Sequence, residues 1–110
     1  MRQAIVYFRD QRAGVLSEDA EGYLFVYDPD YVASPQAHAI SLTLPMTLTP
    51  FRSSVMFPFF DGLIPEGWLL DIAVSNWKID RRDRMALLLA CCKDCIGAVS
   101  LRPLVGKEDV

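Results

Sequence analysis

The sequence predicts an α+β domain in which helices pack on one side of a small antiparallel sheet. Short apolar segments rich in β-forming residues fill the first quarter of the chain, between polar turns. Apolar residues then recur at helical spacing between residues 68 and 92. A last short apolar segment, residues 98–101, follows. This order of strands, then helices, then one strand is typical of helices gathered on one face of a sheet.

The first part of the chain predicts a three-stranded meander. The three strands are expected at residues 4–8, 13–16 and 23–27, and a polar turn joins the first two. Residues 17–22 are polar and end in glycine, which predicts a loop before the third strand. Pro29 stops that strand, because proline has no N–H for the hydrogen-bond ladder.

The middle of the chain is punctuated by prolines and predicts two elements. Residues 40–44 alternate apolar and polar side chains, which predicts a short strand ending before Pro45. Ser53 and Ser54 are candidate helix caps, and the nearly apolar residues 55–63 predict a buried helical segment. Four of its side chains have helical spacing and are expected to face inward: Val55, Phe59, Phe60 and Leu63.

Two helices are expected in the last third of the chain. Residues 68–77 have an apolar face with helical spacing. A second helix is expected to begin at Asp80, with Asp83 as a weak capping partner, and to end at Gly97.

Length and composition limit the class of protein. A chain of 110 residues predicts one domain over residues 1–110, with a frayed tail from about residue 105. Hydrophobic residues make up 52% and charged residues 23%, which excludes a disordered chain. The net charge of −3 argues against direct nucleic-acid binding. With no run of ~18 apolar residues and an odd number of cysteines, we expect a cytoplasmic protein with reduced thiols.

The cysteines near residue 92 form the most conspicuous cluster. Cys92 and Cys95 make a C-x-x-C pair beside Cys91. A structural zinc site needs four ligands, and His38 is the only histidine left to complete one. The end of a helix also disfavours a thiolate. We therefore interpret the cysteines as packing residues and predict no metal and no cofactor.

No catalytic constellation is apparent. His38 has no nucleophile or carboxylate at a recognisable spacing, and the glycines are isolated, so no phosphate-binding loop is present. The basic stretch at residues 78–84 is interrupted by Asp80 and Asp83, which favours a solvated helix start over DNA contact. We predict no catalytic residues and expect that the chain is not an enzyme.

A tryptophan beside a proline–glycine turn is the best candidate for a binding site. Turns lie at the surface, and a large aromatic side chain on a turn is typical of an interface anchor. The alternative is that Trp68 folds back as the first core residue of the next helix, and both interpretations stay open. The candidate partner-binding residues are Ile64, Pro65, Glu66, Gly67 and Trp68.

Four segments, in this order, carry a family resemblance. They are residues 11–16 with 25–29, residues 40–45, residues 59–66 and residues 96–99. Together they resemble the N-terminal subdomain of HipA-type toxin kinases, and the resemblance covers residues 6–103. It implies the fold already expected. The kinase's catalytic-loop aspartate, metal-binding and phosphate-binding motifs are missing from this sequence, so the family's kinase activity does not carry over.

The resemblance also implies partners. Tripartite toxin–antitoxin operons of this family encode the subdomain separately, as an antitoxin beside a shortened HipT-like Ser/Thr kinase and a HipB-like DNA-binding protein. We therefore expect a free-standing chain that neutralises such a kinase in trans within a ternary complex. The turn at Trp68 would project toward the kinase active site and either block it or distort it. The alternatives are a scaffold or activating subunit of a split kinase, a co-repressor acting through the DNA-binding partner, and a small redox or zinc protein.

Overall fold

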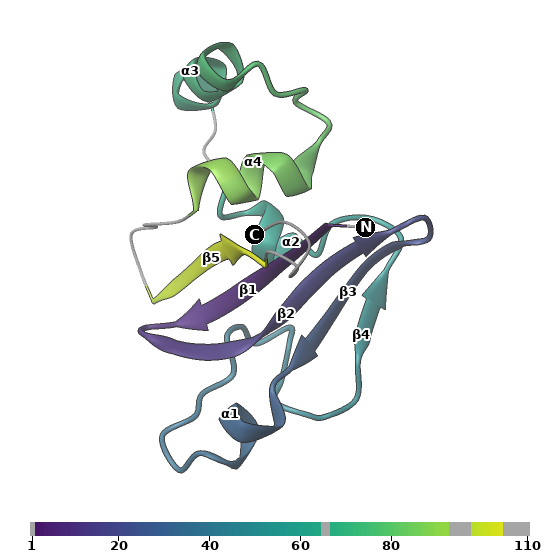
Figure 1. Ribbon diagram of the computed structural model, residues 1–110, viewed down its shortest axis with the longest axis vertical. Helices are drawn as coiled ribbons and strands as arrows, with labels where there is room; N and C mark the ends of the chain where they lie inside the picture. The colour runs from purple at the N-terminus through teal and green to yellow at the C-terminus, as the bar shows by residue number, and fades with distance from the viewer. Residues whose placement is uncertain (1, 65–66, 93–97, 105–110) are drawn as a thin grey trace.

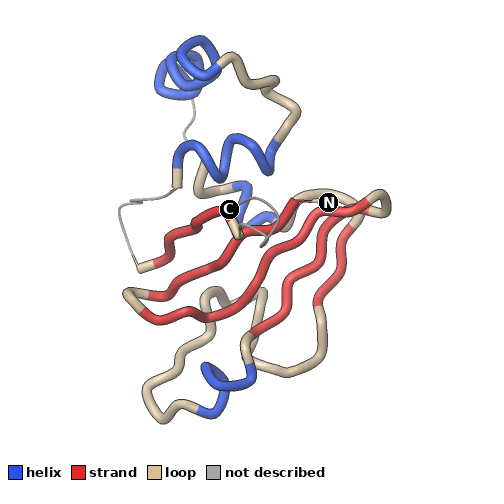
Figure 2. The backbone as a smooth tube through the Cα atoms, viewed as in Figure 1, coloured by secondary structure: helices blue, strands red, loops and turns tan. Residues whose placement is uncertain are grey.

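The computed structural model describes residues 2–64, 67–92 and 98–104, which form five strands and four helices (Figures 1 and 2). In chain order they are β1 (Arg2–Phe8), β2 (Gln11–Asp19), β3 (Gly22–Tyr27), α1 (Pro29–Ala33), β4 (Phe51–Ser53), α2 (Pro58–Asp61), α3 (Gly67–Trp77), α4 (Arg84–Cys91) and β5 (Val99–Pro103). No described helix is long and apolar enough to cross a membrane.

The strands form one antiparallel sheet in the order β4-β3-β2-β1-β5. The predicted meander of β1, β2 and β3 is confirmed, and so is the last strand. The prediction of a polar loop at residues 17–22 is wrong for residues 17–19, because these residues continue β2. Glu18 pairs with Arg2 across the strands and Ser17 accepts a hydrogen bond from the side chain of Gln3 at 3.2 Å, so partners on β1 hold these polar residues in the sheet.

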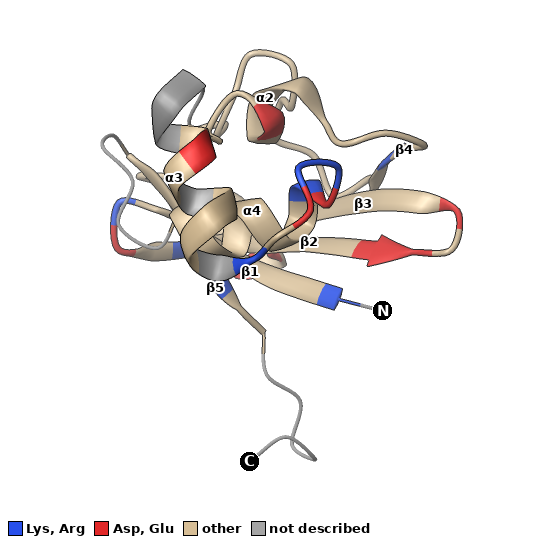
Figure 3. Ribbon diagram, turned by 90° about the horizontal axis from the view of Figure 1, so that it is seen from above, with Lys and Arg blue, Asp and Glu red and all other residues tan. Residues whose placement is uncertain are grey.

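The core lies on one face of the sheet, which confirms the α+β class. Strand residues facing this side are fully or almost fully buried, namely Ala4, Val6, Leu16, Phe25, Tyr27 and Leu101. Phe60 of α2 and the buried residues of α4 belong to the same core, and Phe60 packs on Phe25 with ring centroids 5.5 Å apart. Viewed along the sheet, α2 and the chain leading to it lie on this side (Figure 3).

The prediction of a strand at residues 40–44 is wrong. Ser41 and Leu44 instead close a tight turn through an isolated bridge. The hydroxyl of Tyr27 donates a hydrogen bond to the carbonyl of Leu44 and accepts one from the N–H of Ile40 at 3.1 Å. A phenol therefore satisfies the backbone groups that a neighbouring strand would otherwise have bonded.

The prediction of a helix at residues 55–63 is too long, because α2 has only four residues. Pro58 occupies its first turn, where the missing N–H costs nothing, and Val55 before it is 67% exposed. Phe60 faces the core as expected, and Phe59 and Leu63 pack against it. Two elements were not expected. One is α1, which also starts at a proline, and the other is the short edge strand β4.

Helix α3 confirms the helix expected at residues 68–77, whereas the next helix begins later than expected. The Asp80 carboxylate accepts the N–H of Arg82 at 2.8 Å, so residues 80–83 form a turn. Asp83 caps α4 and accepts the N–H of Ala86 at 3.2 Å. Helix α4 ends at Cys91, and the predicted stop at Gly97 lies outside the described residues.

Candidate partner-binding site

The structure describes three of the five predicted partner-binding residues, and these three lie in different settings. Ile64 is buried in the core with 3% of its surface exposed. Pro65 and Glu66 lie outside the described residues. Gly67 and Trp68 form the N-terminal end of α3. The connection between α2 and α3 is therefore rooted in the core at Ile64, and the partner contact itself stays a prediction.

The chain enters this connection through a continued helical winding. The N–H of Leu63 donates to the carbonyl of Phe60 at 3.0 Å, and the N–H of Ile64 donates to the carbonyl of Asp61 at 3.2 Å. Cys92 lies under the same segment and its thiol donates to the carbonyl of Leu63 at 3.4 Å. These contacts fix the exit from α2 to the end of α4.

Two arginines, Arg81 in the turn before α4 and Arg84 at its first residue, bind and clamp the helices on either side of the connection. Nε of Arg84 lies 2.6 Å from Oδ1 of Asp61, at the end of α2. The guanidinium of Arg81 pairs with Asp71, in the second turn of α3. Arg84 also donates from Nη1 to the carbonyl of Arg81 at 3.0 Å, which joins the two clamps. The stretch 78–84, interpreted as a solvated helix start, therefore ties the end of α2 to α3, the two helices that flank the Trp68 connection.

Sequence reasoning missed Arg81 and Arg84 as site residues. The acidic partners lie 10 and 23 residues away in the chain, so no local spacing reveals the pairs. The solvated interpretation fits the neighbouring Arg82, whose side chain is 93% exposed.

The clamping segment is itself anchored to the sheet. Arg2 of β1 donates from both terminal nitrogens to the Asp83 carboxylate, at 2.7 and 3.0 Å, and from Nε to Glu18 at 2.7 Å. The hydrogen bonds from Arg2 hold the pKa of the Asp83 carboxyl below its usual value, and the two carboxylates raise the pKa of Arg2. A chain of charge-assisted contacts thus runs from β1 through the start of α4 to α3.

Helix α3 presents an apolar residue to solvent near Trp68. Leu70 and Val74 pack against the core, which fixes one side of the helix. Ile72 lies one turn after Trp68 and is 45% exposed. An exposed Ile on an anchored helix is an arrangement suited to a protein contact.

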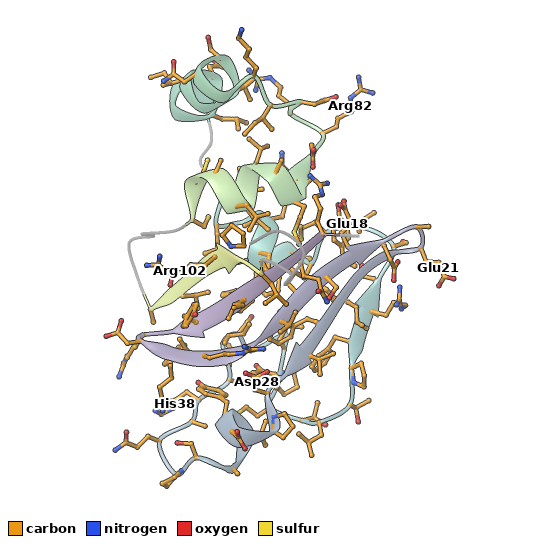
Figure 4. All side chains as sticks on the ribbon, in the orientation of Figure 1. Glu18, Glu21, Asp28, His38, Arg82 and Arg102 are labelled. Atoms are coloured by element: carbon orange, nitrogen blue, oxygen red, sulfur yellow. The ribbon has the colours of Figure 1, made fainter. Side chains whose placement is uncertain are left out.

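The other candidate residues lie elsewhere or serve packing. Cys92 is buried and Cys91 half-buried, whereas Cys95 lies outside the described residues. His38 lies at the far end of the sheet from α3 (Figure 4), beside a cavity of about 580 Å³ between the β1–β2 turn and the chain after α1. Its ring is 5.9 Å from that of Phe8. Within the described ranges, no three His, Cys, Asp or Glu side chains are grouped to hold a metal ion.

Two comparisons with known proteins, one with protein families and one with solved structures, point to the same family. Residues 4–102 match the family described as the HipA N-terminal domain. An uncharacterized protein of Haemophilus influenzae (strain ATCC 51907 / DSM 11121 / KW20 / Rd) is 35% identical over 102 residues, which cover 93% of this chain and 92% of that protein. A solved structure titled "N-terminal domain of HipA toxin" superposes with a TM-score of 0.76 at 32% identity, covering 97% of this chain and 96% of that one.

Proposed function

Because the chain belongs to the HipA N-terminal domain family, we propose that it is the antitoxin of a tripartite toxin–antitoxin system. Its role resembles that of the small protein HipS, which stands beside the kinase HipT and the DNA-binding protein HipB in HipBST systems. The observation that carries the proposal is the nearly end-to-end match with the N-terminal domain of a HipA toxin. On this proposal the chain has no catalytic residues, needs no cofactor or metal and acts in the cytoplasm.

A domain related to part of a toxin has a surface suited to the rest of that toxin. When such a domain binds in trans, association costs several kcal/mol of translational and rotational freedom. A few anchors in a pre-organised setting offset that cost. The clamps from Arg81 and Arg84 supply the setting, and Trp68 and the exposed Ile72 are the proposed anchors. Ile64 supports them from the core.

In the proposed mechanism the connection at Trp68 projects toward the active site of the HipT-like Ser/Thr kinase. There it either blocks nucleotide or substrate or holds the kinase lobes in an unproductive arrangement. Gly67 allows close approach of the backbone, and Glu66 adds a charged contact that sets orientation more than affinity. A HipB-like DNA-binding protein completes the complex, so this acidic chain needs no DNA contact of its own.

The test is growth of cells that express the cognate short kinase, with and without this chain. We expect rescue by the wild type and by Trp77→Ala, a matched tryptophan variant at the other end of α3, and no rescue by Trp68→Ala. A kinase assay with purified proteins separates inhibition from activation. Thermal unfolding of each variant shows whether the fold is intact.

Two results would contradict the proposal. Enhanced toxicity or enhanced kinase activity in the presence of the wild-type chain would favour the scaffold or activating subunit. Unfolding of Trp68→Ala would identify Trp68 as a core residue, and Ile72→Asp, at an exposed position, would then test α3 as the contact. Full rescue by that folded variant would exclude this part of α3 as a contact.

A further inference from the structure

The face of the sheet opposite the core carries its own apolar centre. Ile5, Val15 and Val26 lie side by side on β1, β2 and β3, since Ile5 pairs with Val15 and Val15 pairs with Val26. Strand alternation points them away from the buried partners Ala4 and Leu16. All three are half-buried, and none belongs to the core or packs against it. We call this side of the sheet the open face.

The open face has the layout of a protein interface. Leu24 and Tyr7 extend the apolar centre along β3 and β1. Charged pairs surround it: Arg12 with Asp28 at 2.7 Å, and Arg52 with Asp19 at 3.0 Å. An apolar centre with a polar rim is the usual anatomy of a protein contact. All four described helices contribute residues to the core or pack against it, so none of them covers this side of the sheet; Figure 3 shows this for α2.

The charge on the open face indicates what kind of partner fits it. Arg102 of β5 pairs in register with Ile5 and, unlike Arg12 and Arg52, has no acidic partner among the described residues. Arg52 also lies 3.9 Å from Glu21, so the described carboxylates around the face, Asp19, Asp28 and Glu21, each lie beside Arg12 or Arg52. A second copy packed face to face would offer only these engaged carboxylates, and Arg102 would stay without an acidic partner. The charge favours a partner with an apolar patch flanked by a carboxylate.

We propose that the kinase partner docks on the open face, as a second contact separate from the Trp68 connection. The inference rests on the proposed function. The kinase would present apolar side chains to Ile5, Val15 and Val26 and an acidic side chain to Arg102. This contact would hold the antitoxin on the kinase, and the Trp68 connection would act on the active site.

The test measures the dissociation constant of the complex by titration calorimetry. Val15→Glu places a carboxylate in the apolar centre, and Val55→Glu makes the same change between β4 and α2, outside the face. Arg102→Glu reverses the unpaired charge, and Arg82→Glu makes that change on the exposed turn before α4. Both face variants are expected to weaken binding on the order of 30-fold or more, as at an interface hot spot, and both controls less than 3-fold.

The outcomes separate this inference from the proposed function. Undiminished binding by folded Val15→Glu and Arg102→Glu, with loss of inhibition by Trp68→Ala, would overturn the open-face contact alone. Failure of the wild type to bind the kinase would overturn both proposals. A third outcome is that the wild type sediments as a dimer, Val15→Glu sediments as a monomer, and both bind the kinase equally well. This result would assign the face to a second copy of the chain and reject the kinase as its partner. If Val15→Glu unfolds, Arg102→Glu decides, because Arg102 is exposed.

Discussion

Asp83 joins two parts of the molecule, strand β1 and the start of α4, through one carboxylate. Its oxygens accept both terminal nitrogens of Arg2 on β1, and Oδ1 also accepts the N–H of Ala86 at the start of α4. The next residue, Arg84, holds Asp61. A single acidic side chain thus sets where α4 begins and how the clamping segment sits on the sheet.

This arrangement predicts an acid-sensitive fold. Because Arg2 lowers the pKa of Asp83 in the folded state, the unfolded state binds more protons in acid. The stabilisation is complete above the unfolded pKa of about 3.9 and is lost as pH falls through the lower folded value. We expect Asp83→Asn to unfold about 1–2 kcal/mol more easily at pH 7, since a charged hydrogen-bond partner is weakened, and to lose less stability between pH 5 and pH 3 than the wild type.

Urea denaturation at both pH values measures this effect. Asp80→Asn is the control, because Asp80 is exposed in the preceding turn and does not bind Arg2. Equal acid sensitivity of the wild type and Asp83→Asn would show that other carboxylates control acid unfolding.

At the scale of elements, the arginine clamps predict a loss of inhibition without a loss of fold. In the double variant Arg81→Ala/Arg84→Ala the connection keeps its residues but loses both ion pairs. We expect kinase inhibition to weaken on the order of 5–10-fold, because α2 and α3 are then no longer bound to the segment before α4 and the partner must fix their positions on binding. Surface ion pairs contribute little to stability, so the unfolding temperature should change only slightly.

Arg82→Ala is the matched control for the clamps. It removes a charge from the same segment, but its side chain is almost fully exposed and its nearest acidic atom lies 3.9 Å away, in Asp80. An equal loss of inhibition from Arg82→Ala would mean that general positive charge matters and the clamps do not.

Elements with a strong local pattern were predictable from sequence. Strands β1, β2, β3 and β5 contain short apolar segments rich in β-forming residues, and helix α3 carries apolar residues at helical spacing. Residues 40–44 alternate apolar and polar side chains, yet form a turn, because the deciding contact is the hydroxyl of Tyr27, 13 and 17 residues away from its two bonding partners in the chain. The apolar run before Gly62 predicted a long helix, whereas α2 starts only at Pro58 and lasts four residues. A tertiary contact decided the first case, and in the second Pro58 marks the start of the helix.

The candidate site was only partly predictable for the same reason. The Trp68 connection is visible locally, as a tryptophan beside a proline–glycine turn. Its clamps are not, because each joins residues far apart in the chain. The open face also has a signal in the sequence: Ile5 and Val15 are apolar although their strand neighbours Ala4 and Leu16 already fill the core side. Apolar residues on both faces of a strand indicate that both faces are covered.

At the scale of the whole molecule, the two proposed contacts lie on separate parts of the structure. Helix α3 projects beyond α4, away from the sheet, whereas the open face lies on the side of the sheet opposite the core (Figures 1 and 3). A kinase that engages both would have to reach around the antitoxin.

This separation predicts independent energetics. Sites without shared contacts usually contribute additively to binding free energy. We expect the fold-losses in affinity of Trp68→Ala and Val15→Glu to multiply in the double variant, within a factor of about 2–3. Titration of the four proteins of the cycle against the kinase measures this. A double variant no weaker than the weaker single variant would show that both changes disrupt one contact.

Both edges of the sheet are closed to the addition of another strand. On β5, the N–H of Leu101 donates to the carbonyl of Cys92 at 2.8 Å, so the chain leaving α4 occupies a position that an added strand would use. On the other side β4 has three residues and follows Pro50. Short or occupied edges prevent strand-by-strand polymerisation. A protein with such edges avoids strand-by-strand association when it is present in excess over its target, even while its apolar open face is unoccupied.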